Sequence, residues 1–144
     1  MEIEEIGSGF SRQVIAWASA PDVVFKFARW PNFNLSEYCF WQSRKDTEVA
    51  AHLAPCVDIT ADGYVLTMKR TTPLKAAGIT LPDWLLLAEP HSRLSRQQVE
   101  ELGLHYELMP YDIKPENLSI FNGRIVLHDY ASSTAPLLFH ELSR

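Results

Sequence analysis

The chain has 144 residues, of which 47% are hydrophobic and 22% are charged, values that are ordinary for one globular domain of this length. Its formal net charge of -5 at pH 7 argues against a nucleic-acid binder that works through bulk positive charge. We expect no membrane segment and no signal peptide, since the apolar runs are short and the first residues are acidic. The two cysteines form no CxxC pair, which argues against a disulfide scaffold or a zinc module.

Three short segments at the start of the chain are predicted to form antiparallel strands. Residues 3–7 alternate between apolar and polar positions and run into a Gly-Ser-Gly turn at 7–9. Residues 14–17 and 23–27 are rich in β-branched and aromatic side chains, and a Ser-Ala-Pro-Asp turn separates them. This pattern predicts an initial strand followed by a hairpin.

The middle of the chain is predicted to form a helix and a second hairpin. Asn34, with Glu37 three residues later, fits a capping box that opens a helix. We expect this helix to reach about Leu53, where a proline soon follows. Residues 56–60 and 64–69 then form two strands joined by an Ala-Asp-Gly turn.

The second half of the chain is predicted to be more helical. A short apolar helix is expected around residues 84–87, and a second capping box opens a helix over 95–108. Residues 118–121 and 124–128 flank an Asn-Gly pair, which is the strongest hairpin signal in the chain. The order of elements indicates an α+β fold with an N-terminal five-stranded antiparallel sheet and one helix.

One charged residue interrupts a strand that is otherwise suited to burial. Lys26 stands within Val-Val-Phe-Lys-Phe, and a buried lysine is costly unless it pairs with an anion. This pattern makes Lys26 a candidate for contact with a carboxylate or a phosphate. The alternative is an edge strand on which Lys26 faces water.

The densest group of chemically active residues is Tyr-Asp-Ile-Lys-Pro-Glu-Asn at 111–117. It places a carboxylate, an amine and a carboxamide within six residues. The hairpin that follows would return Asp129 to the side of Asn117, and oxygen ligands from these two residue types suit magnesium. The alternative is that Asp112 and Asn117 are turn residues that cap backbone groups.

In content and in order, these motifs resemble those of protein kinases. Residues 7–14 resemble the glycine-rich loop, with Arg12 where a third glycine is usual. Residues 23–26 resemble the strand that carries the ATP-binding lysine. Residues 111–117 are similar to the catalytic loop, and 129–131 to the magnesium-binding triplet.

The resemblance covers about residues 3–131 and implies a minimal or truncated member of the protein kinase-like superfamily, similar to small bacterial or phage-encoded serine/threonine kinases. We expect a kinase-like N-lobe at 1–70 and a truncated, helical C-lobe at 71–144 that carries the catalytic loop and a small hairpin. Two further departures from the family pattern are a Pro-Tyr pair where His-Arg is usual and Ala131 where a glycine is usual.

The resemblance implies an ATP-dependent phosphotransferase that requires Mg²⁺. Asp112 would orient the attacking hydroxyl, and Lys114 would lie near the terminal phosphate. Lys26 would hold the inner phosphates and would itself be held by a glutamate, for which Glu37 is favoured over Glu48. The other nucleotide contacts would come from Gly7, Ser8, Gly9, Val14 and Met68, and the metal ligands would be Asn117 and Asp129.

Two functions follow from this resemblance. The first is an active serine/threonine kinase with a protein substrate, which the set of retained catalytic residues favours. The second is a catalytically weak or inactive kinase-like module that binds and regulates a protein partner, which the short tail and Ala131 favour. A small-molecule phosphotransferase is the weaker third option, because such enzymes also use a large lower lobe. We expect a cytoplasmic protein, with an effector secreted into a host as the alternative.

Overall fold

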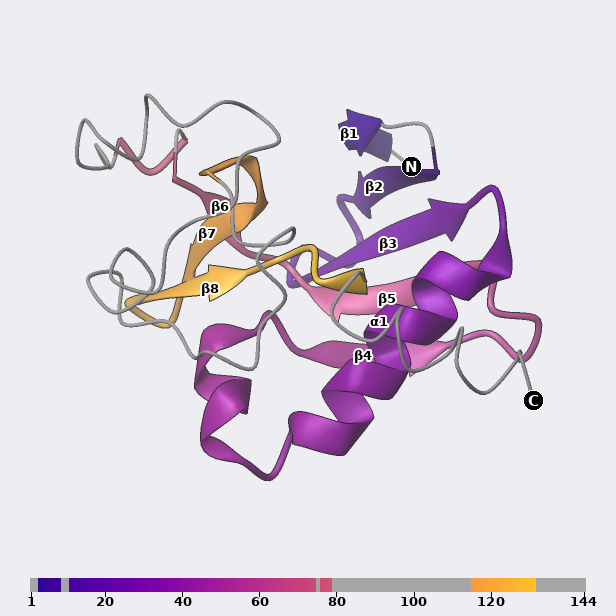
Figure 1. Ribbon diagram of the computed structural model, residues 1–144. Coiled ribbons are helices and arrows are strands. Elements are labelled where there is room, and N and C mark those ends of the chain that lie inside the picture. The colour runs from indigo at the N-terminus through magenta and orange to yellow at the C-terminus, as the bar shows by residue number, and fades with distance from the viewer. Residues whose placement is uncertain (1–2, 9–10, 75, 79–114, 132–144) are drawn as a thin grey trace.

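The computed structural model describes residues 3–8, 11–74, 76–78 and 115–131 (Figure 1). Its larger part is a five-stranded antiparallel sheet with the strand order β1-β2-β3-β5-β4. The sheet therefore places β3 at its centre and leaves β1 and β4 at its edges. Its strands are β1 Ile3–Ser8, β2 Arg12–Trp17, β3 Val23–Ala28, β4 Cys56–Ile59 and β5 Val65–Lys69.

The helix α1 (Pro31–Arg44) packs across one face of this sheet (Figure 1). It begins earlier than the sequence predicts, because Pro31 occupies the first turn, where the fixed φ of proline suits a helix. Trp30 is the N-cap and makes no side-chain capping bond. The prediction of a capping box at Asn34 and Glu37 is therefore wrong, because both residues lie within the helix and neither is its N-cap.

The helix also ends earlier than the sequence predicts. After α1 ends at Arg44, a separate 3₁₀ helix, η1 (Glu48–His52), occupies the rest of the expected span. Thr47 separates the two, and its hydroxyl accepts a hydrogen bond from the backbone N–H of Val49 at 3.3 Å. This side-chain cap at Thr47 starts a new helix instead of continuing the first one.

A second, smaller sheet has the strand order β6-β7-β8. It consists of β6 (Thr72–Pro73), β7 (Leu118–Phe121) and β8 (Arg124–Leu127), and η2 (Pro115–Asn117) precedes β7. The expected Asn-Gly hairpin is confirmed: Asn122 and Gly123 have φ values of 51° and 76°, as a tight hairpin turn requires. The short β6 was not predicted.

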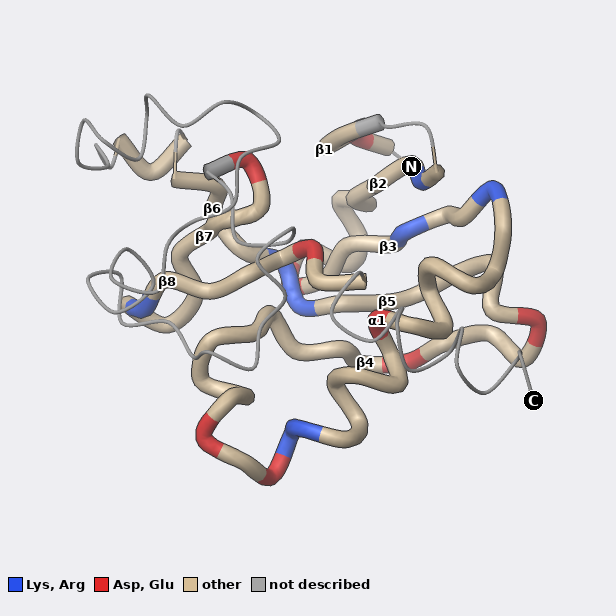
Figure 2. Tube along the Cα trace, viewed as in Figure 1, with Lys and Arg blue, Asp and Glu red and all other residues tan. Residues whose placement is uncertain are grey.

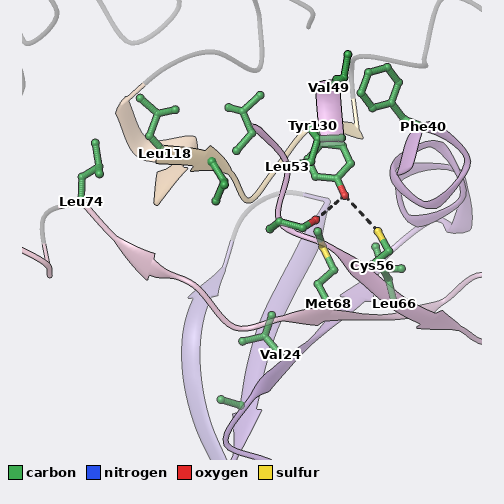
Figure 3. Close-up of a cluster of buried hydrophobic side chains, with 14 residues drawn as sticks. Val24, Phe40, Val49, Leu53, Cys56, Leu66, Met68, Leu74, Leu118 and Tyr130 are labelled. Carbon is green, nitrogen blue, oxygen red and sulfur yellow. Dashed lines mark hydrogen bonds between the residues drawn. The ribbon is translucent and has the colours of Figure 1, made fainter. Parts of the chain in front are cut away.

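Backbone contacts join the two sheets through the chain that follows η1. Leu53 forms a parallel bridge with Leu127, and the N–H of Ala54 donates to the carbonyl of Leu127 at 2.8 Å. A cluster of buried hydrophobic side chains fills the space around this junction, with Tyr130 among them (Figure 3). The junction brings the segment after β8 close to α1 and the large sheet.

Within the described ranges the fold is α+β, with a five-stranded antiparallel sheet and one α-helix, as expected. The helices expected around 84–87 and over 95–108 lie outside these ranges, and the division into lobes at residue 70 stays a prediction. No helix in the described part of the chain is both long and apolar enough to cross a membrane.

Candidate functional site

Four charged side chains from β2, β3, α1 and the segment after β8 meet in one place. Figure 2 shows where lysine, arginine, aspartate and glutamate lie along the chain trace. We call Arg12, Lys26, Glu37 and Asp129 the charged cluster. Glu37, which is 0% exposed, is its centre. One oxygen of Glu37, Oε1, accepts from Nζ of Lys26 at 2.5 Å and from Nη1 of Arg12 at 2.8 Å.

The other oxygen of Glu37 is also satisfied. Oε2 accepts from the backbone N–H of Tyr130 at 2.7 Å and from Nη2 of Arg12 at 3.3 Å. Both oxygens of this buried carboxylate therefore have cationic or N–H donors, which is the condition under which a charge is tolerated in a protein interior. Glu37 thus links β2, β3 and the segment after β8 to α1.

The polar character of α1 on its buried face is unusual for a helix that packs on a sheet. Such a helix normally buries an apolar stripe, but three of the four fully buried residues of α1, Asn34, Ser36 and Glu37, are polar. Asn34 donates to the backbone carbonyl of Lys26 at 3.0 Å and accepts from Arg12 at 3.3 Å. Polar contacts therefore help to position the helix, together with Phe40, which lies in the hydrophobic core.

Lys26 lies on β3, in register with Val14 on one side and Leu66 on the other. The alternative of a water-facing edge lysine is wrong, because β3 is central and Lys26 is 3% exposed. Besides Glu37, its Nζ donates to the backbone carbonyl of His128 at 2.5 Å. These two contacts use two of its three N–H groups and direct the ammonium toward the segment after β8.

Arg12 joins the two carboxylates of the charged cluster. Its Nη2 donates to Oδ1 of Asp129 at 2.6 Å, and its side chain is 7% exposed, whereas that of Asp129 is 43% exposed. Burial acts to raise the pKa of Asp129, but the positive charges of Arg12 and then Lys26 outweigh it and hold the pKa at about 2. Asp129 is therefore ionised at neutral pH and is neutralised by Arg12.

A cavity of about 460 Å³ lies beside the charged cluster. This volume is within the range of small-molecule sites. Lys26 and His128 stand at its wall. Burial, followed by the charge of Lys26, lowers the pKa of His128, so the imidazole is neutral at pH 7. The apolar part of the lining comes from Ile6, Val14, Val24, Ala54, Met68, Pro73 and Ala76.

The structure brings together several of the residues that the sequence singled out. Gly7, Val14, Lys26 and Met68 all line the cavity. Glu37 is the residue that pairs with Lys26. Glu48 lies instead in η1 and is exposed.

Three other predicted residues fall outside the described ranges, and one is described only in part. Gly9, Asp112 and Lys114 lie outside the described residues. Ser8 ends β1. Nothing in the structure bears on the roles expected of these four residues, which stay predictions.

The hairpin returns the chain as expected, since the backbone N–H of His128 donates to the carbonyl of Asn117 at 2.9 Å. Asn117, which is buried, and Asp129 therefore come from neighbouring segments. Their oxygens are of the type that magnesium prefers. However, Oδ1 of Asp129 is held by Arg12, and the described residues contain no group of three or more His, Cys, Asp or Glu that would hold a metal ion. A metal ion on Asp129 therefore does not fit this arrangement.

Sequence reasoning missed the roles of Arg12, Asn34 and Tyr130 in the site. Arg12 carried a signal, because it stands where the kinase pattern has a glycine, but its inward direction was not foreseen. Asn34 looked like a helix cap, and Tyr130 had no signal beyond its place after Asp129.

A scan against protein-family models finds no match to this chain, and a search of curated proteins finds no significant match. The likeness to protein kinases therefore stays a resemblance of sequence motifs.

Proposed function

We propose that this protein binds ATP in the cavity beside Lys26 and is a phosphotransferase of the protein kinase type, acting on serine or threonine of a protein substrate. The observation that carries the proposal is the buried Lys26–Glu37 pair, at 2.5 Å, on the wall of a largely apolar cavity. Most of the lining is apolar, and its charged residues are Glu4, Glu5, Lys26, Lys69, Arg70 and Glu116. An apolar wall suits a planar ring, and the fixed ammonium of Lys26 suits phosphates.

The energetics of the Lys26–Glu37 pair support a functional role. Burying two charges is expensive, and a well-packed apolar pair in the same place is often as stable or more so. Here the pair is held by Arg12 and by the backbone of His128 and Tyr130. Such an arrangement orients the ammonium of Lys26, and ionisable groups held in this way beside a cavity are candidates for binding sites.

The resemblance supplies the rest of the proposed reaction. Asp112 would orient the hydroxyl of the substrate and Lys114 would lie near the terminal phosphate. The resemblance also implies Mg²⁺ on Asn117 and Asp129, but the pairing of Asp129 with Arg12 does not fit a metal ion on that carboxylate. Catalysis of this kind depends mainly on positioning and electrostatic stabilisation.

A specific contact favours the second candidate function, a weakly active or inactive kinase-like module that regulates a protein partner. The carboxylate of Asp129, the expected metal ligand, is paired with Arg12 at 2.6 Å. A protein whose metal ligand is already neutralised would bind nucleotide without efficient phosphate transfer.

Nucleotide binding is tested by titrating the full chain with ATP and following its melting temperature. A ligand that binds the folded state raises this temperature by mass action. Lys26→Met is expected to weaken ATP binding at least tenfold, while the matched variant Lys45→Met, at an exposed lysine just after α1, binds like the parent. Equal ATP affinity in Lys26→Met and Lys45→Met would refute the proposed site.

The two candidate functions are separated by radiolabel transfer from ATP to protein. The kinase function predicts incorporation that Asp112→Asn reduces at least a hundredfold, as loss of a catalytic group commonly does. ATP binding without any incorporation would favour the regulatory module.

A further inference from the structure

The guanidinium of Arg12 is bound to the carboxylate of Asp129, which a kinase-type site would need to leave free for a metal ion. It donates to Glu37 through both terminal nitrogens, to Asp129 at 2.6 Å and to Asn34 at 3.3 Å. With its side chain 7% exposed, Arg12 is packed between α1 and the segment after β8. The planar fork of arginine suits such simultaneous contacts with two carboxylates.

The charged cluster is balanced without any added ion. Arg12 and Lys26 supply two positive charges, and Glu37 and Asp129 supply two negative charges. A divalent cation on Asp129 would lie beside the guanidinium, and like charges at such a separation repel.

We propose that Arg12 is an internal cation at Asp129, so that the guanidinium and a divalent metal ion exclude one another at this carboxylate. Arg12 is then a positioning residue that sets the metal dependence of the site. While Arg12 holds Asp129, nucleotide binds through Lys26 and the cavity without a metal ion. Metal binding at Asp129 requires Arg12 to leave that carboxylate. The inference deepens the proposed function, and the metal measurement below does not depend on it.

The first experiment uses Mn²⁺ alone as the probe, with the full chain and no nucleotide. Loss of the free Mn²⁺ signal in electron paramagnetic resonance reports binding. Arg12→Gln leaves the cluster with one unbalanced negative charge, so we expect it to bind Mn²⁺ at least tenfold more tightly than the parent. The matched control is Arg124→Gln, which removes an exposed arginine on β8 and is expected to bind Mn²⁺ like the parent.

The same experiment includes Asp129→Asn in the Arg12→Gln background. The gain in Mn²⁺ affinity is expected to disappear, because the proposed ligand is gone. Parent protein that binds Mn²⁺ as tightly as Arg12→Gln would overturn the inference. So would a gain that survives Asp129→Asn, since the ion would then be held elsewhere.

The second experiment compares ATP affinity in Mg²⁺ with that in a metal chelator, measured by calorimetry. We expect the ratio to stay within threefold for the parent and to exceed tenfold for Arg12→Gln. Absence of any ATP binding by the parent would refute the proposed function, while the Mn²⁺ result still decides the inference.

Arg12 is buried, so folding of each variant is checked by circular dichroism. If Arg12→Gln is not folded, the inference is tested with Arg12→Lys instead. This variant keeps the positive charge, but a single ammonium cannot bridge the carboxylates of Glu37 and Asp129. Arg12→Lys is expected to gain at least threefold in Mn²⁺ affinity over Arg124→Lys. No gain in that comparison would overturn the inference.

Discussion

The two sides of the segment that follows β8 are held in opposite ways. On one side, the carboxylate of Asp129 and the backbone N–H of Tyr130 join the charged cluster. On the other side, the ring of Tyr130 is 0% exposed and lies 5.9 Å from that of Phe40, measured between centroids. Its hydroxyl donates to the carbonyl of Ala54 at 2.8 Å and contacts Sγ of Cys56 at 3.3 Å (Figure 3).

The comparison shows that the apolar contacts hold the segment after β8 in the fold, whereas the charged contacts set its orientation. Burial of the Tyr130 ring removes apolar surface from water and stabilises the fold in any orientation that packs well. The charged side adds little net stability, because desolvation offsets much of the Coulomb attraction. Its contribution is direction, since Asp129 pairs with Arg12 while the backbone N–H of the next residue, Tyr130, donates to Glu37.

The sharpest way to break the charged side is Glu37→Gln. The substitution leaves the charges of Arg12 and Lys26 buried with only Asp129 to balance them, and loss of one partner of a buried ion pair costs about 3–5 kcal/mol. Urea denaturation should show a loss of this size in the free energy of unfolding. The matched variant Glu48→Gln, at an exposed site in η1, should change it by less than about 0.5 kcal/mol. A loss below about 1 kcal/mol in Glu37→Gln would contradict the central role of this carboxylate.

A smaller effect is expected from Tyr130→Phe on the apolar side. The ring stays, but the carbonyl of Ala54 loses its donor, and an unsatisfied buried group of this kind costs about 1–2 kcal/mol. Denaturation of Tyr130→Phe is compared with that of Tyr64→Phe, whose residue is 44% exposed and should change stability by less than about 0.5 kcal/mol. Equal stabilities in the two variants would show that the hydroxyl contact of Tyr130 is not needed.

The smallest effect concerns the buried thiol beside Tyr130. Burial, followed by the negative charge of Glu37, raises the pKa of Cys56 from 9.0 to about 12. Because the unfolded thiol ionises near pH 9 and the folded one does not, stability is intact below pH 9 and falls as the pH rises toward 12. Between pH 8 and pH 10, this thiol alone should lower the free energy of unfolding by about 1 kcal/mol.

Cys56→Ala removes this titration and provides the control. Its stability should fall less than that of the parent over the same pH range, as measured by urea denaturation at each pH. The other cysteine, Cys39, is exposed and is present in both proteins, so it does not affect the comparison. Parallel pH profiles for parent and variant would mean that Cys56 ionises as readily in the folded state as in the unfolded state.

The sequence predicted correctly those strands and turns whose conformation depends on residues close together along the chain. The β-branched runs at β2 and β3 and the Asn-Gly turn at 122–123 carry their own conformational preference, and the structure has them where they were expected, to within two residues. Prediction failed at α1, because Asn34 and Glu37 have the spacing of a helix cap. Their side chains instead serve partners on β2 and β3.

The sequence predicted several residues of the candidate site, but it did not predict which of their side chains contact one another. Lys26 was found because a lysine in a buried strand demands a partner, and the choice of Glu37 came from the kinase resemblance. Arg12 was noticed only as a departure from a glycine pattern. Nothing in its local sequence indicates that its guanidinium lies against Asp129, which is 117 residues away along the chain.

The amino-acid sequence by itself determined the described strands other than the short β6, their tight turns and the need to neutralise Lys26, since these depend on local propensity and on the cost of burying a charge. The tertiary structure alone decided that Arg12, rather than a solvent-facing group, completes the charge balance. The reason is that pairing in a protein interior depends on which side chains the fold brings within about 3 Å of one another, and that distance is set by the packing of α1 and the hairpin against the sheet.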